Sequence, residues 1–443
     1  MIRQILETLT IWAQAPTRKP LLIRGARQIG KTFVVQELAK KFISFVMIDF
    51  ELEPQFKTCF NTLDPKEITQ AISIIKSTAI IPGQTLLFLD EIQECPSAIQ
   101  ALRYFREKMP ELHVIAAGSL LEFALRKEEI SMPVGRIEYL YMKPCSFDEY
   151  LQNTGQNQAR ELLNQVSISN PPSQAIHEHL LSLFQKFMIS GGMPEAMNTL
   201  INTGDWLSVQ RVQNTLLQTY RDDFGKYASL SQQVYLQTLF DKAPGMAGTQ
   251  VSYSKIDPDA RSRDLKNAIL LLEYAGLVKS IYATAASGLP LDATMNQKKF
   301  KLHFLDIGLV QRKTGLSPLT LLQEDFSQIN QGALAEQAVA QELLAYQDPF
   351  APQDLYFWAR DARNAQAEVD FILNIDGKII PIEVKSGPIG KLKSLLLLLK
   401  ERNLPLGIKI SKAPLGQDGP VLNIPFYMIK QLVTQLDQLL KEK

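Results

Sequence analysis

Short apolar runs alternate with amphipathic stretches over the first third of the chain. Runs of mostly apolar residues predict buried strands, and apolar residues spaced three and four positions apart predict helices between them. This alternation is typical of a parallel sheet with helices on both faces. The predicted strands are Leu21–Arg24, Phe45–Phe50, Thr85–Asp90, Val114–Ala117 and Ile137–Tyr141, and the predicted helices lie near Lys31–Lys40, Lys66–Lys76, Ser97–Lys108 and Leu120–Lys127.

The pattern changes in the rest of the chain. His177 to Lys226 is helical and must turn sharply at Gly191–Pro194. Residues 230–310 predict three short helices and a β-hairpin with strands Leu277–Tyr282 and Lys299–Leu305, which is the outline of a winged helix. The last segment predicts a helix from Gly332, strands Ala367–Leu373, Lys378–Lys385, Leu406–Ile410 and Leu422–Tyr427, and a helix at Lys391–Arg402.

A phosphate-binding loop follows the first predicted strand. The residues from Gly25 to Thr32 match G-x-x-x-x-G-K-[ST], and a helical pattern begins directly afterwards. Its two glycines let successive backbone N–H groups face a polyphosphate, and the helix N-terminus adds further donors. The predicted nucleotide contacts are Gly25, Ala26, Arg27, Gln28, Ile29, Gly30, Lys31, Thr32 and Phe33; Lys31 is expected at the β- and γ-phosphates and Thr32 at Mg²⁺.

Two acids end the third predicted strand. The apolar run Leu86–Leu89 is followed by Asp90 and Glu91, the pattern of a Walker B strand. Asp90 is expected to hold Mg²⁺, and Glu91 to orient or deprotonate the attacking water. A surface acidic pair is the alternative, which the preceding phosphate loop disfavours.

Two further polar residues are candidates for catalysis. Ser119 ends the fourth predicted strand, where it is expected to sense the γ-phosphate, to cap the following helix, or to do both. Arg136 precedes the last strand and is either an arginine finger, acting in the same chain or on a neighbouring subunit, or a residue of a structural salt bridge or of a solvated loop.

Composition restricts the class of protein. The chain has 443 residues, a net charge of +1 and 21% charged residues, so any nucleic-acid site must be a local feature. The three dispersed cysteines indicate a reducing cytoplasm, and the sequence shows neither a signal peptide nor a run long enough to cross a membrane.

Basic residues cluster in the predicted winged helix. Arg261, Arg263 and Lys266 open its longest helix, and the hairpin adds Lys298, Lys299 and Lys301. These side chains are expected either to contact DNA phosphates or to be solvated on a module that contacts only protein.

The last segment contains a second group of acids. Helix residue Glu336, strand residue Asp370 and the pair Glu383 and Lys385 have the layout of a PD-(D/E)XK nuclease, in which the acids hold Mg²⁺ beside the lysine. The alternative is a fold that survives as a binding platform, with its acids hydrogen-bonded structurally.

Nearly the whole chain resembles prokaryotic AAA-family ATPases with a C-terminal domain of unknown function. The shared motifs are Gly25–Thr32, Leu89–Gln93, Ala117–Ser119, Gly135–Arg136 with Lys143–Tyr150, Gly191–Ala196, Tyr220–Asp223, Phe300–Leu309, Glu368–Phe371 and Pro381–Lys385. One small departure is Cys145, at a position where Leu is usual in the family. Together with the resemblance, the patterns described above predict an α/β P-loop ATPase domain over 1–163, a helical lid over 175–228, a winged helix over 229–320 and a nuclease-like domain over 330–443. The lid would sense nucleotide through Arg211 or Arg221.

Three functions follow from these observations. The first is a Mg²⁺-dependent ATPase that couples its nucleotide state to DNA engagement by the C-terminal modules. The second is an ATP-regulated, metal-dependent nuclease. The third is a nucleotide-gated scaffold that assembles with itself or with a protein partner. ATP and Mg²⁺ are the cofactors expected in each case.

Overall fold

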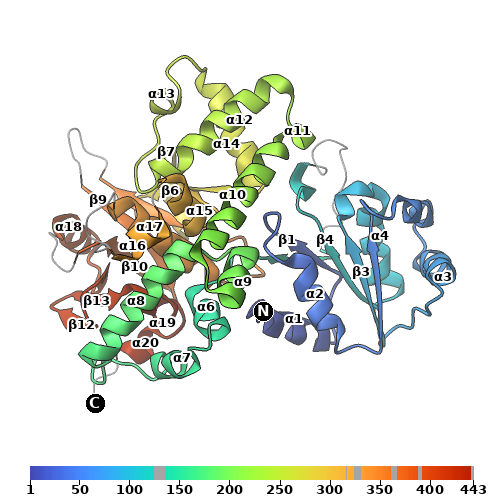
Figure 1. The fold of residues 1–443 in the computed structure, drawn as a ribbon, viewed down its shortest axis with the longest axis horizontal. Helices are drawn as coiled ribbons and strands as arrows, with labels where there is room; N and C mark the ends of the chain where they lie inside the picture. The colour runs from blue at the N-terminus through green and yellow to red at the C-terminus, as the bar shows by residue number, and fades with distance from the viewer. Residues whose placement is uncertain (124–134, 316, 324–330, 361–366, 388–391, 441–443) are drawn as a thin grey trace.

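Two sheets organise the molecule, one in each of the lobes visible in Figure 1. The computed structural model describes residues 1–443 apart from 124–134, 316, 324–330, 361–366, 388–391 and 441–443. In this part of the chain no helix is both long and apolar enough to span a membrane.

The sheet of the N-terminal lobe has five strands in the order β2-β3-β4-β1-β5, and every neighbouring pair is parallel. The predicted parallel α/β architecture is therefore confirmed. The strands are β1 (Leu21–Arg24), β2 (Ser44–Asp49), β3 (Thr85–Asp90), β4 (His113–Ala117) and β5 (Glu138–Tyr141).

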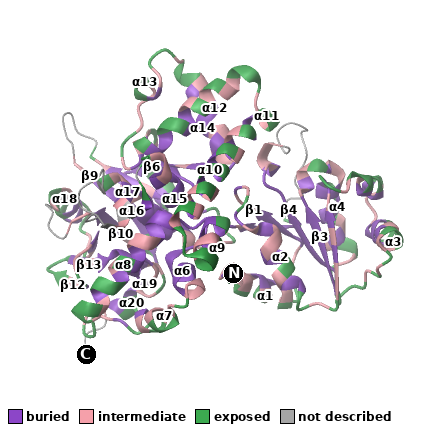
Figure 2. Ribbon diagram, in the orientation of Figure 1, coloured by how far each residue is buried: buried purple, intermediate pink, exposed green. Residues whose placement is uncertain are grey.

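Strand β3 shows why the apolar runs lack alternation. Leu86 and Phe88 pack into one hydrophobic core, whereas Leu87 and Leu89 pack into another on the opposite face. Figure 2 shows these strands as buried between helices with exposed outer faces. The helices and turns around the sheet are α1 (Ile5–Gln14), α2 (Lys31–Ala39), η1 (Pro54–Phe60), α3 (Pro65–Lys76), η2 (Ile92–Glu94) and α4 (Pro96–Lys108). Residues 124–127 of the predicted helix Leu120–Lys127 lie outside the described residues.

A helical segment connects the two lobes. It contains α6 (Phe147–Asn153), α7 (Asn157–Leu163), α8 (Gln174–Ser190), α9 (Pro194–Thr203), α10 (Trp206–Asp222) and α11 (Phe224–Tyr227). The predicted break occurs between α8 and α9, where Gly191 has a φ of 71°. A Cβ at Gly192 would lie 2.1 Å from the carbonyl oxygen of Cys145, so this turn packs tightly on the chain that leaves the first sheet.

The second sheet has eight strands in the order β12-β13-β11-β10-β9-β8-β6-β7 and mixes parallel with antiparallel pairs. Its strands are β6 (Val278–Thr284), β7 (Met295–Phe304), β8 (Tyr356–Ala359), β9 (Glu368–Ile375), β10 (Lys378–Val384), β11 (Gly407–Ser411), β12 (Gly416–Asp418) and β13 (Val421–Pro425). The remaining elements are α12 (Leu230–Lys242), η3 (Ala243–Met246), α13 (Tyr253–Ile256), α14 (Ser262–Tyr274), η4 (Leu291–Thr294), α15 (Ile307–Lys313), α16 (Pro318–Gln323), α17 (Gln331–Ala345), α18 (Lys393–Arg402), η5 (Phe426–Met428), α19 (Ile429–Thr434) and α20 (Leu436–Leu439).

The hairpin β6–β7 is part of this larger sheet and does not stand apart as a wing. Tyr282 of β6 pairs in parallel with Tyr356 of β8, which joins the hairpin to the C-terminal strands. Lys301, predicted to lie exposed on the wing, is therefore in the interior, and its side chain is only 2% exposed. The prediction that Lys301 contacts DNA is wrong, because its side chain lies against carboxylates of α17 and β9.

Candidate functional site

The phosphate-binding loop (P-loop) between β1 and α2 has the backbone conformation its sequence predicts. Gly25 has a φ of 145° and Gly30 a φ of 88°, both in the region that favours glycine. A Cβ at Gly25 would lie 2.6 Å from the carbonyl oxygen of Met142, at the end of β5. The glycines therefore allow both the loop conformation and its close packing at the carboxyl edge of the sheet, where α/β proteins bind ligands.

Lys31 is held inside the P-loop. Its Nζ donates hydrogen bonds to the carbonyl oxygens of Gly25, at 3.0 Å, and Ala26, at 2.9 Å. Burial lowers the pKa of Lys31 to about 8, although the charges of Glu91 and Asp90 raise it. The ammonium is thus paired only with neutral oxygens in this conformation, and a polyphosphate would provide a stronger partner.

Thr32 and Asp90 meet across the start of α2 and the end of β3. The Thr32 hydroxyl donates a 2.6 Å hydrogen bond to Asp90 Oδ2. Burial raises the pKa of Asp90 above its usual range, while this hydrogen bond opposes the rise. A hydroxyl and a carboxylate at this distance form an oxygen-rich donor set of the kind Mg²⁺ prefers, so the residues fit the predicted cation.

Glu91 and Ser119 are also in contact. Glu91 has a φ of 46°, which is unusual for a residue with a side chain and re-aims its carboxylate at the strand end. Its Oε2 accepts hydrogen bonds from the Ser119 hydroxyl, at 3.3 Å, and from Gln93 Nε2, at 2.6 Å. The structure thus brings Ser119 to the acid that was predicted to act on water.

Arg136 lies away from this group. It precedes β5, and the register pairs Glu138 of β5 with Leu21 at the start of β1. The P-loop follows the other end of β1, so Arg136 is at the opposite edge of the sheet, where its Nε donates to Glu107 at 2.9 Å. The prediction of a finger acting within the same chain is therefore wrong for this arrangement.

Three segments far away in sequence touch the P-loop. Arg3 donates to the carbonyl oxygen of Ile29 at 2.8 Å, and the Tyr220 hydroxyl donates to that of Arg27 at 2.9 Å. A Cβ at Gly276, in the turn between α14 and β6, would lie 3.1 Å from the backbone nitrogen of Ala26. A cavity of about 210 Å³ lies beside this contact and is lined by Gly25, Ser119 and Gly276, among others.

These contacts were not predicted. The sequence points to Arg211 or Arg221 in the helical segment, but Arg221 forms an ion pair with Asp241 of α12. Besides Tyr220, the residue of this segment that reaches the P-loop is Asp223, whose Oδ1 lies 2.6 Å from Arg27 Nη1. In the sequence, only the motif Tyr220–Asp223 pointed to this contact, and its spacing does not show which side chain faces the P-loop.

The second group of predicted site residues gathers around a lysine. Lys301 Nζ lies 3.0 Å from Glu336 Oε2, 2.6 Å from Glu368 Oε1 and 3.5 Å from Asp370 Oδ1. Although burial alone would lower it, the charges of Glu336, Asp370 and Glu368 raise the pKa of Lys301 above its ordinary value. We call these residues, together with Glu383 and Lys385, the acidic cluster.

The rest of the acidic cluster differs from the predicted metal site. Lys385 Nζ lies 2.6 Å from Glu383 Oε1, as the spacing E-x-K predicts. Burial, followed by the charge of Asp370, raises the pKa of Glu383 to about 7 and that of Glu336 well above its ordinary value. Among the residues that the structure describes, no group of three His, Cys, Asp or Glu side chains is arranged to hold a metal ion. The prediction that Glu336, Asp370 and Glu383 form a ligand set is therefore not met.

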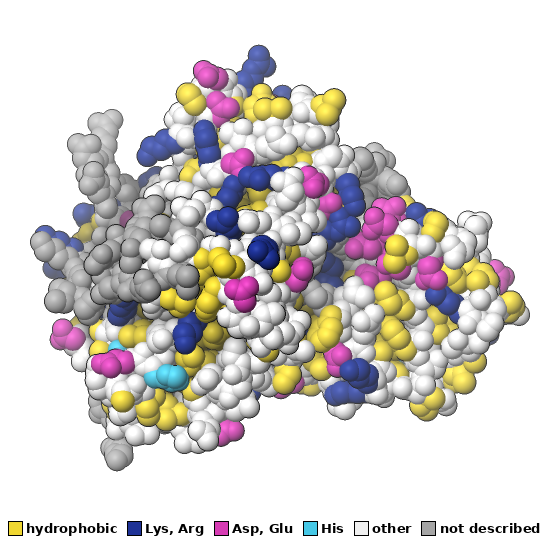
Figure 3. Space-filling model, in the orientation of Figure 1, with side chains coloured by type: hydrophobic (Ala, Val, Ile, Leu, Met, Phe, Trp, Pro, Cys, Tyr) yellow, Lys and Arg dark blue, Asp and Glu magenta, His cyan; other side chains and the backbone are white. Residues whose placement is uncertain are grey.

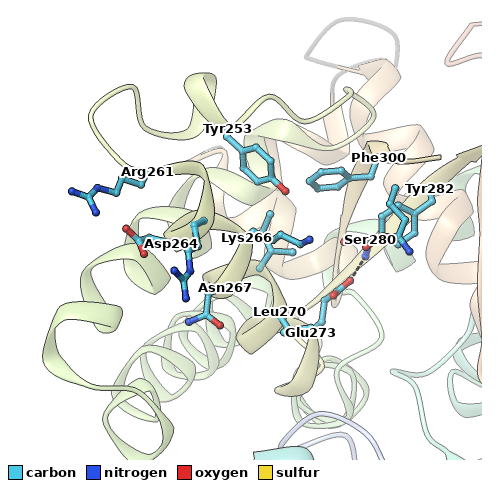
Figure 4. Close-up of a pocket in the computed structure, with 13 residues that line it drawn as sticks. Tyr253, Arg261, Asp264, Lys266, Asn267, Leu270, Glu273, Ser280, Tyr282 and Phe300 are labelled. Carbon is cyan, nitrogen blue, oxygen red and sulfur yellow. Dashed lines mark hydrogen bonds between the residues drawn. The ribbon is translucent and has the colours of Figure 1, made fainter. Parts of the chain in front are cut away.

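A cavity of about 560 Å³ lies between α13, α14 and the hairpin (Figure 4). We call the part of the molecule around α12, α13 and α14, drawn at the top of Figure 1, the upper lobe. Three of the predicted DNA contacts, Arg261, Arg263 and Lys266, are among its lining residues and are exposed. Figure 4 shows the rings of Tyr253 and Phe300 side by side, with centroids 5.9 Å apart. Figure 3 shows Lys and Arg side chains over this lobe and the middle of the molecule, in no single continuous patch.

Comparisons with known families divide the chain into three parts. Residues 17–151 match a family model described as an AAA domain. Residues 181–320 and 331–420 match two domains of unknown function, DUF8612 and DUF4143. The match over 17–151 supports an AAA-family ATPase. A search of curated proteins found no match.

Solved structures that match this chain do so with low TM-scores and low sequence identity. A Walker-type ATPase of Pyrococcus abyssi is 14% identical over 70% of this chain and 95% of its own, with a TM-score of 0.45. The ORC1 protein of Aeropyrum pernix in complex with DNA is 13% identical over 71% of this chain and 93% of its own, with a TM-score of 0.32.

Proposed function

We propose that this AAA-family ATPase domain binds Mg·ATP at the P-loop and hydrolyses it. The observation that carries the proposal is the convergence of Lys31, the bonded pair Thr32 and Asp90, and Glu91 at one edge of the parallel sheet. These groups come from the start of α2 and the end of β3, and each has the chemistry that phosphoryl transfer requires.

Each residue has a distinct part in the proposed reaction. Lys31 leaves the two P-loop carbonyls and pairs with the β- and γ-phosphates. Thr32 and Asp90 would hold Mg²⁺, which supplies charge neutralisation at the phosphates when bound. Glu91, oriented by Ser119, accepts a hydrogen bond from the attacking water and positions it for in-line attack.

Loss of the Lys31 ammonium tests the binding site. We expect Lys31→Ala to abolish ATP binding in calorimetry, because a buried charge-assisted contact to phosphate is lost. Lys40→Ala is the matched control, since Lys40 is exposed just after α2 and pairs with Glu37. An Lys31→Ala affinity equal to that of the control would refute the assignment.

We extend the proposal to the other parts of the chain. The ATPase domain spans 1–163, and the helical lid spans 175–228 and reads the P-loop through Tyr220 and Asp223. A winged-helix region over 229–320 and a nuclease-like domain over 330–443 share the second sheet. Contacts of the lid and of Gly276 with the P-loop support coupling between nucleotide and these C-terminal parts.

DNA is the proposed partner of the upper lobe. The cavity of Figure 4 combines exposed cations with aromatic rings, the pairing that binds nucleic-acid phosphates and bases. Arg261, Arg263 and Lys266 would contact phosphates, and Lys298 and Lys299 lie on the neighbouring strand. The net charge of +1 means that this binding depends on the local cluster.

The ATPase rate with and without DNA tests this partner. We expect stimulation by DNA that is lost in Arg263→Ala/Lys266→Ala, and binding that weakens as salt is raised. Lys255→Ala, in α13, is a control on the same lobe. An ATPase rate indifferent to DNA would instead favour a protein partner, and an ATP-dependent mass change in light scattering would favour the nucleotide-gated scaffold or a homo-oligomer.

A further inference from the structure

The acidic cluster contains its own cation. Lys301 lies on β7, and the three carboxylates within 3.5 Å of it come from α17 and β9, namely Glu336, Glu368 and Asp370. We infer that the Lys301 ammonium permanently occupies the position that a divalent metal would take, so that the C-terminal domain is a metal-free module that does not cleave nucleic acid.

Burial and charge explain why this lysine stays in place. The Lys301 side chain is 2% exposed, and those of Glu336 and Asp370 are 15% and 12% exposed. An ammonium withdrawn from this position would leave carboxylates buried without a counter-charge, which is strongly destabilising. Movement of the Lys301 ammonium out of the cluster into water is therefore unfavourable unless another cation replaces it at the same time.

The carboxylate oxygens are already engaged by the protein. Asp370 Oδ2 accepts the backbone N–H of Val384 at 2.8 Å, while its Oδ1 faces Lys301. Glu383 Oε1 is paired with Lys385, and only its buried Oε2 lacks a partner in the described structure. A magnesium ion is usually held by one or two carboxylates together with water, and here the oxygens of Asp370 and Glu383 Oε1 already face a lysine or a backbone N–H.

The chain also covers the cluster from the side of the loop that follows η3. A Cβ at Gly248 would lie 3.1 Å from the carboxylate carbon of Glu336. Gln250 Nε2 donates to Glu368 Oε2 at 2.6 Å, and the same residue forms an isolated bridge with Lys301. A phosphate diester approaching from this side would have to displace this segment.

Manganese binding tests the inference. The full chain is titrated with Mn²⁺ by calorimetry and paramagnetic resonance, with Asp90→Asn in every variant to remove the ATP-site cation. We expect no Mn²⁺ at the cluster of the parent chain, so that adding Asp370→Asn changes nothing. Lys301→Met should gain a single Mn²⁺, and the further change Asp370→Asn should remove it. Lys298→Met, on the exposed part of β7, is the matched control.

Several outcomes would overturn the inference. Mn²⁺ binding by the parent chain that Asp370→Asn removes would show that metal enters despite Lys301. Cleavage of linear DNA by the parent chain with Mn²⁺, abolished by Asp370→Asn, would show the same in a functional assay. A folded Lys301→Met variant that binds no Mn²⁺ would show that the lysine does not stand in a metal position. If Lys301→Met does not fold, the comparison of the parent chain with Asp370→Asn still decides the question.

Discussion

The affinity for ATP should fall as the pH rises above about 8, because Lys31 is partly desolvated before the nucleotide binds. In the structure its ammonium donates hydrogen bonds to the carbonyls of Gly25 and Ala26, and burial lowers its pKa to about 8. Phosphate oxygens stabilise the charged form, so the pKa in the complex is higher than in the free protein. Binding therefore takes up a proton at alkaline pH, and its free energy becomes less favourable as the pH rises.

The size of this change in ATP affinity follows from the pKa of Lys31 in the absence of phosphate. With a pKa of about 8, roughly one Lys31 in ten is charged at about pH 9, whereas most are charged at about pH 7. If the complex stays protonated, the association constant falls about tenfold over this range, or about 1.4 kcal/mol. Calorimetry in buffers of different ionisation enthalpy measures both the affinity and the proton uptake.

Two variants separate Lys31 from other titrating groups. Lys31→Arg stays charged throughout this range, so its affinity should be lower overall but nearly independent of pH. Thr32→Ala should weaken binding and keep the slope, because it removes the proposed magnesium ligand and not the titrating group. A wild-type affinity that is flat from about pH 7 to about pH 9, or a slope that persists in Lys31→Arg, would contradict the reasoning.

Three further substitutions test the site and its support. Glu91→Gln should leave ATP binding intact and slow phosphate release by about 10²–10⁴-fold, the usual contribution of a positioned base, and undiminished turnover would remove Glu91 from the mechanism. Gly192→Ala should lower the free energy of unfolding in urea by at least about 1–3 kcal/mol, since its Cβ would meet a carbonyl oxygen at 2.1 Å, whereas Gly225→Ala, with nothing within 4 Å, should not. Tyr220→Phe should cost about 1 kcal/mol through the lost hydrogen bond to the P-loop, and an unchanged urea midpoint would show that this contact contributes nothing.

The ATPase sheet could be predicted from the sequence because local signals agree there. The run Leu86–Leu89 is apolar on both faces, the acids Asp90 and Glu91 mark its carboxyl end, and the P-loop glycines mark the same edge of the sheet. Parallel connectivity then brings residues far apart in sequence together. Arg136 precedes β5, and the starts of parallel strands lie at the edge of the sheet opposite the P-loop. Parallel connectivity therefore also argues against Arg136 as an arginine finger within its own chain.

The second sheet could not be predicted in the same way. Lys299 and Lys301 have the alternation of one strand face, and nothing in their neighbourhood distinguishes the partly exposed from the buried side chain. The difference arises from tertiary neighbours. Helix α17 packs on β7 and places Glu336 against Lys301, while the pairing of β6 with β8, residues more than seventy positions apart, joins the hairpin to the sheet that contains Asp370. A buried charge is compensated by residues that are distant in sequence, so the local sequence pattern does not show which lysine is buried.

The contact of Gly276 with the P-loop gives nucleotide binding a physical route to the second sheet. Lys31 bonds the carbonyl of Ala26 in the present conformation, and the backbone nitrogen of the same residue would lie 3.1 Å from a Cβ at Gly276. When Lys31 pairs with phosphate, the Ala26 carbonyl loses its hydrogen-bond donor. A resulting shift of the backbone at Ala26 would change its packing against Gly276, in the turn from α14 into β6. One side of that turn carries the cavity of Figure 4, and the other leads through the hairpin to Lys301. Coupling between two sites requires an element that has two arrangements. If this turn is that element, Gly276→Ala should alter both the affinity for ATP and the stimulation of the ATPase rate by DNA. A variant in which neither quantity changes would exclude this turn as the link.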